Sequence, residues 1–357
     1  MKAARLHRFD PDFAVPPGQT LREVMDSQGM TQRDLAARTG LTVQTLSRII
    51  KGIQPISYET ANRLEMVVGV PARLWNRLEA EYREQLSKQA ERGRLRDGLD
   101  WLKTIPTREL IERGALSPQR DKVLLLRETL AFFGVSSVEA WHSIWDEPAV
   151  AARRSACFET RPGPAATWIR LGERQASEID CRPHDAGRFK DALHEIRGLT
   201  REEPHVFVHR MRSLCADAGV ALALVREMKQ VPWNGATKWM SPSKAMILLN
   251  LRGKGEDRFW FSFFHEASHV LNDSKKCILI NDESDVDPRE RAANAFAAET
   301  LIPARHNDDI RSARTAFDLK RLARAIGVSV GVVAGRYQYL TKRWNYHRDL
   351  IRRLEWA

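Results

Sequence analysis

Residues 258–273 read RFWFSFFHEASHVLND, and this stretch decides how the second half of the chain is interpreted. It contains the pattern HExxH, formed by His265, Glu266 and His269. On an α-helix, positions i and i+4 project from the same face, so two imidazoles can bind one zinc ion. Glu266 lies about 100° around the helix axis from His265, where it can take a proton from a water molecule beside the metal. The stretch therefore predicts a zinc site that performs hydrolysis.

The residues around the motif decide between this interpretation and a partly exposed helix with solvated histidines. The apolar run FWFSFF, residues 259–264, favours a buried helix. Buried polar groups without a partner are costly, and a bound metal would give these side chains partners. The context therefore favours the metal site.

A third metal ligand has to come from the residues after the motif. Spacing alone does not choose among six candidates, which are Glu283, Asp285, Asp287, Glu290, Glu299 and His306. Pro288 suits the first position of a helix. Glu290 follows Asp287 by three residues, so it could instead be the second arm of a capping box.

A second informative stretch, residues 30–52, reads MTQRDLAARTGLTVQTLSRIIKG. Thr31 and Thr42 each stand where a side chain caps a helix, and Gly40 between them suits a tight helix end. The second helix has an apolar inner stripe and a polar outer face. A short helix, a glycine turn and such a helix are typical of a recognition helix presented to the major groove of DNA.

The side chains of the outer face suit DNA contacts. Gln44 can pair with adenine through two hydrogen bonds, and Val43 and Thr45 offer methyl contacts to thymine. Arg48 or Lys51 can reach phosphates. The alternative is a helical module that binds only protein. The first 100 residues hold 16 basic and 13 acidic residues, and such a small net charge favours this alternative, because it gives little electrostatic attraction to DNA.

Length and composition indicate a globular chain of two or three domains, with 357 residues, 43% of them hydrophobic and 29% charged. No apolar run is long enough to cross a bilayer, and the first residues lack a signal peptide. We therefore expect a soluble cytoplasmic protein, associated with the nucleoid and not with membranes. The four cysteines form no CxxC pair, so we expect them to be buried small apolar residues.

Positive charge is concentrated at the end of the chain. The formal net charge is +11, and residues 311–357 hold 11 basic and 3 acidic residues. This basic segment includes the runs LKRLARAIG and KRWNYHRDLIRRLEW. It could bind nucleic acid, or it could be the solvated face of a helix.

Two further regions carry structural expectations. Residues 77–200 show successive patterns of helical length, in which three tryptophans are expected to pack between helices: Trp141, Trp145 and Trp168. Residues 244–253, KAMILLNLRG, are strand-like. We expect the part MILLNLR to pair with an extended substrate along the edge of a sheet.

The first 80 residues resemble a known family of regulators. Residues 30–79, from MTQRDLAARTG to ARLWNRLE, are similar to the Xre-type helix-turn-helix and, more narrowly, to HigA-type antitoxins. This resemblance implies that Val43, Gln44, Thr45 and Arg48 contact base edges and that Gln32 contacts a phosphate. Together with Thr42 and Lys51 they form the candidate DNA-binding set.

The second half resembles the ImmA/IrrE metallo-endopeptidases. The resemblance is carried by HEASH and by ERAANAFAAETLIP, residues 290–303, and extends to the segments before and after them. It implies that His265, His269 and Glu290 bind Zn²⁺ and that Glu266 is the catalytic base. Ser268 stands where the family often has glycine, and it keeps that position small.

These observations together predict a mainly α multidomain protein. We expect a five-helix helix-turn-helix domain at residues 16–76, a helical middle at 77–200, an α+β zincin-like metallopeptidase domain with a small sheet at 201–310, and a basic helical segment at 311–357. The resemblance implies a homodimeric regulator that binds operator DNA and cleaves a partner repressor or antitoxin. The rival is a HigA-like antitoxin that binds a toxin, with the peptidase fold as sensor or scaffold.

Overall fold

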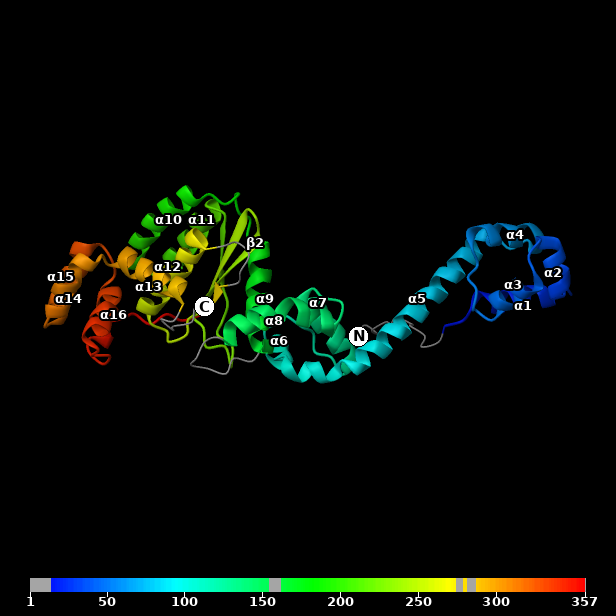
Figure 1. Cartoon of the computed structure of the whole chain (residues 1–357), viewed down its shortest axis with the longest axis horizontal. Helices are drawn as coiled ribbons and strands as arrows, with labels where there is room; N and C mark the ends of the chain where they lie inside the picture. The colour runs from blue at the N-terminus through cyan, green and yellow to red at the C-terminus, as the bar shows by residue number, and fades with distance from the viewer. Residues whose placement is uncertain (1–13, 154–161, 274–278, 281–286, 357) are drawn as a thin grey trace, which may run out of the picture. The chain divides into compact units, whose positions relative to one another are not determined.

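The computed structural model describes residues 14–153, 162–273, 279–280 and 287–356 (Figure 1). The chain divides into two compact units, one ending at Gly98 and the other beginning at Leu99. Each unit has its own hydrophobic core. We therefore describe the two units separately.

The first unit consists of five helices in the described part of the chain. They are α1 (Pro17–Ser27), α2 (Gln32–Thr39), α3 (Val43–Ile50), α4 (Tyr58–Val68) and α5 (Ala72–Asp97). Apolar residues of all five helices meet in one core that includes Leu21, Leu35, Leu46 and Trp75. The five expected helices are thus confirmed. The α5 helix continues to Asp97. The expected domain boundaries at 76, 200 and 310 remain predictions.

Side-chain caps fix the ends of α2 and α3, as the sequence predicts. Thr31 accepts a hydrogen bond from the backbone N–H of Asp34, whose carboxylate accepts one from the backbone of Thr31 in return. Gly40 ends α2 in the left-handed conformation, with φ of 71°. Thr42 accepts from the backbone N–H of Thr45 and starts α3. This is the local geometry of a helix-turn-helix.

The second unit begins with helices that lead into the sheet. They are η1 (Leu99–Thr104), α6 (Thr107–Glu112), α7 (Lys122–Phe133), α8 (Val138–Arg153), α9 (Pro162–Glu178), α10 (Ala186–Gly198), η2 (Leu199–Arg201) and α11 (Pro204–Asp217). Trp141, Trp145 and Trp168 are at most 3% exposed, and Trp141 and Trp145 pack against aromatic rings of η1 and α7. They are packing residues, as expected.

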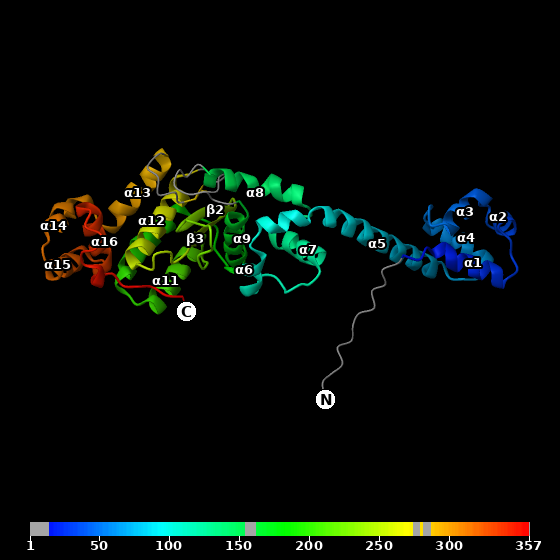
Figure 2. The ribbon, with the colours of Figure 1, turned by 90° about the horizontal axis from the view of Figure 1, so that it is seen from below.

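A four-stranded sheet forms the centre of the second unit. Its strands are β1 (Val220–Leu224), β2 (Gly235–Ser241), β3 (Lys244–Leu249) and β4 (Leu279–Ile280), in the order β1-β3-β2-β4. The β1 and β3 strands are parallel, and the other two pairs are antiparallel. The sheet lies between α12 (Glu256–Asn272), which contacts β2 and β3, and α9, which contacts β1 and β3 (Figures 1 and 2).

The position of β3 corrects one prediction. The stretch MILLNLR was expected to offer a sheet edge to a substrate, but β3 is hydrogen-bonded to β1 on one side and to β2 on the other. Its residues from Ala245 to Leu249 are fully buried. A continuous apolar run is typical of a central strand covered on both faces. The length of the run alone does not distinguish a central strand from an edge strand.

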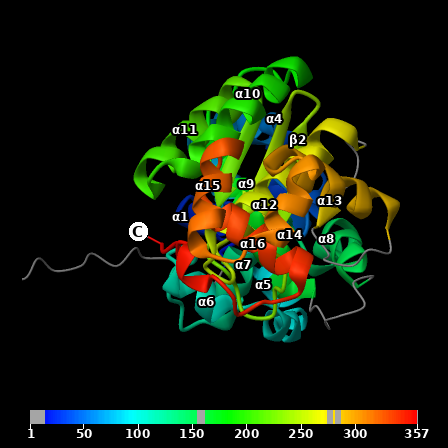
Figure 3. The same cartoon turned by 90° about the vertical axis from the view of Figure 1, so that its left-hand side faces the viewer.

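The last helices complete the core of the second unit. They are α13 (Pro288–Leu301), η3 (Ala304–His306), α14 (Asn307–Ser312), α15 (Ala316–Ile326), α16 (Val330–Thr341) and η4 (Arg348–Leu350). The α16 helix packs against α12, α14 and α15 (Figure 3). Apolar residues of α15 and α16 belong to the same core as those of α12. The basic segment is therefore built into this unit.

The architecture confirms the expected fold class, a mainly helical chain whose second unit carries a small sheet. Across the residues that the structure describes, no helix combines the length and the apolarity that crossing a bilayer requires.

Candidate metal centre

The α12 helix buries the HExxH motif. Its first turn carries Glu256 and Asp257, which suit the positive end of the helix dipole. From Phe259 onward most of its side chains are buried, and His265 and His269 are at most 1% exposed. The two imidazoles lie one turn apart on one face, with their ring centroids 4.8 Å from each other.

Three side chains converge at this point, His265 and His269 from α12 and Glu290 from α13. The two Nε2 atoms of the histidines are 3.1 Å apart. Oε2 of Glu290 lies 3.0 Å from Nε2 of His265, and Oε1 lies 3.3 Å from Nε2 of His269. Ligand atoms about 2.0 Å from a tetrahedral zinc ion are ~3.3 Å from one another, so these spacings suit one small cation.

The outer nitrogens of both imidazoles face oxygen atoms. Nδ1 of His265 lies 2.9 Å from Oδ1 of Asn294, and Nδ1 of His269 lies 2.6 Å from Oδ2 of Asp273. A carboxylate only accepts hydrogen bonds, so Nδ1 of His269 is the donor to Asp273. The amide oxygen of Asn294 also only accepts, so Nδ1 of His265 is a donor as well. Each Nε2 then presents a lone pair inward, and two lone pairs at 3.1 Å need a cation or a proton between them.

The pKa shifts of the clustered side chains also favour a cation at this point. Burial alone would lower the pKa of His269, but hydrogen bonds and charges from Glu290, Glu266 and Asp273 outweigh it and raise that pKa to about 9. Burial likewise would raise the pKa of Glu290, and the two histidines instead hold it below its ordinary value. The centre therefore favours a positive charge. Two histidines and one carboxylate are a donor set that zinc takes in catalytic sites, so the residues present fit this metal.

Glu266 lies beside the cluster and is held by the sheet. Its Oε2 accepts a hydrogen bond of 2.7 Å from the hydroxyl of Thr237 on β2. Its Oε1 is buried and has no hydrogen-bond partner among the described residues. Gly235 lies against the carboxylate, because a Cβ there would be 2.5 Å from Oε1. Burial raises the pKa of Glu266 above its ordinary value.

The other candidate ligands lie elsewhere or outside the described residues. Asp287 caps α13 by accepting from the backbone N–H of Arg289, and the alternative role of Glu290, as the second arm of a capping box, is not found. Glu299 accepts from the backbone N–H of Ala304. Neither these two residues nor His306 joins the cluster of described residues. Glu283 and Asp285 fall outside the described residues.

Sequence reasoning missed three residues of this site. Asp273 follows His269 by four positions, and Asn294 follows Glu290 by four, so helical spacing could have identified both. Thr237 is separated from Glu266 by 29 residues and meets it only because β2 packs on α12. No local pattern in the sequence indicates that contact.

The candidate DNA-binding residues lie on α2 and α3 of the first unit, with Thr42 and Lys51 as the two caps of α3. Val43, Gln44, Arg48 and Lys51 are exposed, whereas Gln32 is only half-buried at the start of α2. The hydroxyls of Thr42 and Thr45 are 2.9 Å apart and hydrogen-bonded. The outer face of α3 is thus available, with Thr42 serving as its cap.

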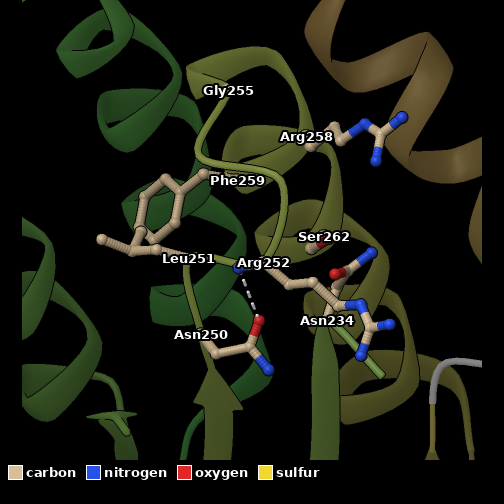
Figure 4. A pocket seen from close by; sticks show the side chains of 8 residues that line it. All are labelled: Asn234, Asn250, Leu251, Arg252, Gly255, Arg258, Phe259 and Ser262. Carbon is tan, nitrogen blue, oxygen red and sulfur yellow. Dashed lines mark hydrogen bonds between the residues drawn. The ribbon is translucent and has the colours of Figure 1, made fainter. Parts of the chain in front are cut away.

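A small pocket lies at the beginning of α12. It is lined by residues of the turn after β3 and by Asn234, Phe259 and Ser262 (Figure 4). Arg252 lies beside Asn234 there, and its Nη1 donates to the carbonyl of Val231 at 2.6 Å. None of the three clustered side chains lines this pocket.

Comparisons with known proteins agree with this arrangement. Residues 21–75 match the family model described as Helix-turn-helix, and residues 222–338 match the one described as IrrE N-terminal-like domain. Two segments of the chain are thus similar to known families, the first to helix-turn-helix modules and the second to the IrrE N-terminal-like domain, as the sequence predicted.

Comparison with individual proteins adds one solved structure. No curated protein matches the chain. The solved structure of an addiction module antidote protein of a HigA family from Coxiella burnetii is 20% identical to it. That match covers 30% of this chain and 98% of the other, with a TM-score of 0.21.

Proposed function

We propose that this protein is a transcriptional regulator that binds operator DNA and cleaves a partner protein with a zinc-dependent endopeptidase site. The observation that supports the peptidase most is the pair of inward-facing Nε2 atoms 3.1 Å apart, next to the carboxylate of Glu290. A divalent cation at the centre would accept the lone pairs of both nitrogens and balance the charge of the carboxylate.

In this proposal His265, His269 and Glu290 hold the zinc ion, and three protein ligands leave one position open. Bound zinc would supply Lewis-acid polarisation of a peptide carbonyl and of the attacking water. Glu266 accepts the proton of the attacking water at Oε1, because Oε2 already accepts a hydrogen bond from the hydroxyl of Thr237. Its raised pKa brings the carboxylate closer to the pH at which a general base works best.

The first unit supports the choice of partner. Its α3 helix exposes Val43, Gln44 and Arg48, which suit operator DNA in the major groove. A regulator that also cleaves a protein would act on a repressor or an antitoxin bound near the same DNA. We further propose that it works as a homodimer in the cytoplasm, associated with the nucleoid.

One observation favours a second candidate. His265, Glu266, His269 and Glu290 are all at most 6% exposed. A centre this buried also suits a structural metal, in an antitoxin or repressor that binds a toxin without turnover. Cleavage is the property that separates the two candidates.

The test starts with the metal content of the purified protein. The protein is then incubated with the product of the neighbouring gene, with and without a chelator. Glu266→Gln should keep the zinc and lower cleavage by about 10² to 10⁴-fold, since the base is lost while the ligands remain. Glu299→Gln is the matched control, because this exposed glutamate lies on α13 outside the cluster.

The outcomes divide as follows. Cleavage that requires metal and Glu266 supports the peptidase. A stable complex without cleavage supports the antitoxin. Unchanged proteolysis by Glu266→Gln contradicts the role given to that residue.

A further inference from the structure

The end of α16 carries cations and aromatic rings in alternation. Arg336 lies over the ring of Tyr339, with 5.8 Å between its guanidinium carbon and the ring centroid. Nζ of Lys342 lies 4.3 Å from the centroid of Tyr339 and 5.9 Å from that of Trp344. We call these four residues the aromatic row. Arg343 lies over Tyr346 beside it, at 5.3 Å.

The rings of this region are exposed. Tyr339 and Trp344 are each 54% exposed and Tyr346 is 53% exposed. Large apolar side chains at the surface call for an explanation when they cluster. Cation–π contacts occur about once per 70 to 80 residues, whereas four of them fall within the 11 residues from Arg336 to Tyr346.

The backbone holds these rings in place. Lys342 ends α16 with φ of 57°, and His347 has the same value. Non-glycine residues adopt this left-handed conformation rarely, and they keep it where the surrounding structure imposes it. The side-chain amide of Gln338 donates to the carbonyl of Tyr346 at 2.7 Å. The rings therefore keep a defined arrangement, which lowers the entropy cost of binding a ligand.

The segment that carries the rings is mostly basic. Residues 336–353 contain six basic residues and one acidic residue, Asp349. Arg352 among them is committed to a buried pair with Glu256, with 2.8 Å between Nη2 and Oε2. The remaining cations leave a positive surface in which flat apolar faces are interspersed.

We propose that the aromatic row, with Arg343 and Tyr346, binds single-stranded nucleic acid. Unpaired bases stack on exposed aromatic rings while cations contact the phosphates, and this combination is typical of surfaces that bind single strands without reading a sequence. A duplex keeps its bases stacked inside and offers the rings no faces. The inference goes beyond the proposed function and does not depend on it, since it uses neither α3 nor the metal centre.

The experiment measures binding of the full-length protein to a fluorescein-labelled oligo(dT) of about 16 nucleotides by anisotropy. The double substitution Tyr339→Ala/Trp344→Ala should weaken binding by about 25-fold or more, because it removes two stacking contacts and each is worth roughly 5- to 150-fold. Trp344→Phe should retain most of the affinity, since it keeps a stacking face. Lys342→Gln should lower the slope of log K against log salt by about 0.7.

Two controls make the result specific. Phe317→Ala removes an aromatic ring that is 73% exposed on α15, outside the aromatic row, and it should leave binding unchanged. Gln44→Ala/Arg48→Ala should weaken binding to duplex DNA and leave binding to oligo(dT) intact. A circular dichroism spectrum like that of the parent shows that each variant is folded.

Three outcomes would overturn the proposal. The first is binding by Tyr339→Ala/Trp344→Ala within about twofold of the parent. The second is an equal loss with Phe317→Ala. The third is a parent protein that does not bind oligo(dT) but binds vesicles of anionic phospholipid, which would assign the rings to a membrane surface.

Discussion

Each imidazole of the candidate metal centre is oriented by a residue on its outer side. Asp273 faces Nδ1 of His269 at 2.6 Å and makes its Nε2 the metal-facing atom. Outer partners of this kind contribute about 10- to 100-fold to metal affinity. We therefore expect Asp273→Ala to weaken zinc binding by that factor in a competition titration with a chromophoric chelator. Asp217→Ala is the control, since this exposed aspartate pairs with Arg182 away from the centre. Equal affinity in both variants would contradict the role of Asp273.

Thr237 holds Glu266 through a buried hydrogen bond of 2.7 Å. A hydrogen bond to a charged group contributes about 1.5 to 3 kcal/mol, or roughly 10- to 100-fold. We expect Thr237→Val to lower kcat of the proposed cleavage by this factor with little change in KM. Thr237→Ser should restore it, because the serine hydroxyl reaches the same oxygen.

Zinc affinity provides the control for Thr237, because its hydroxyl bonds to Glu266 and not to a proposed metal ligand. It should therefore be equal in both variants. A parallel loss of zinc in Thr237→Val would mean that Thr237 supports the fold of the site and not the position of the base.

At the residue scale, the sequence predicts the metal ligands better than the residues that orient the ligands and the base. His265 and His269 follow from helical spacing, and Glu290 followed only from the family resemblance, because six candidates had equal claims by position. The support from Thr237 depends on β2 packing against α12, and such a contact leaves no periodic signal.

At the scale of elements, one local pattern occurs twice with different surroundings. The α15 helix starts with a capping box of Thr315 and Asp318 and ends at Gly327 in the left-handed conformation, and Ser329 then caps α16. The α2 and α3 helices have the same order of caps. The outer face of α3 is exposed, whereas α16 is buried against α12. Local sequence thus predicts helix, turn and helix, but not which face remains free.

Small residues allow α16 to pack on the start of α12. A Cβ at Gly331 would lie 2.1 Å from Oε1 of Glu256, which is 2% exposed and held by Arg352. Alanine improves helix propensity by about 1 kcal/mol. Overpacking costs about 1 to 3 kcal/mol, and a disturbed buried ion pair costs about 3 to 5 kcal/mol. The cost exceeds the gain, so we expect Gly331→Ala to lower the free energy of unfolding of the second unit by about 2 kcal/mol or more.

Hydrogen exchange of α12 amides under native conditions measures this effect. Gly198→Ala is the matched control, because this helical glycine at the end of α10 has no atom within 4 Å of the added Cβ. It should leave the exchange rates the same or slower. If both variants exchange alike, the close contact between α16 and Glu256 does not limit stability.

At the scale of the whole molecule, the two cores are separate. The first is built from α1 to α5 and the second from elements after residue 99. The sequence predicted both kinds of unit, because each carries a motif of its own. It did not predict that α5 would run without a break from Ala72 to Asp97, since the polar pattern of this helix beyond residue 76 resembles that of the helices that follow.

Separate cores predict that damage to one unit leaves the other intact. A Cβ at Gly18 on α1 would lie 2.3 Å from Cα of Ile50 on α3, and a backbone atom cannot move aside as a side chain can. We therefore expect Gly18→Ala to destabilise the first unit by about 1 to 3 kcal/mol and to weaken duplex DNA binding. Zinc content should remain at the parent level. Conversely, His265→Ala should lose zinc and keep DNA binding, and a Gly18→Ala protein that also loses zinc would show that the two units fold as one.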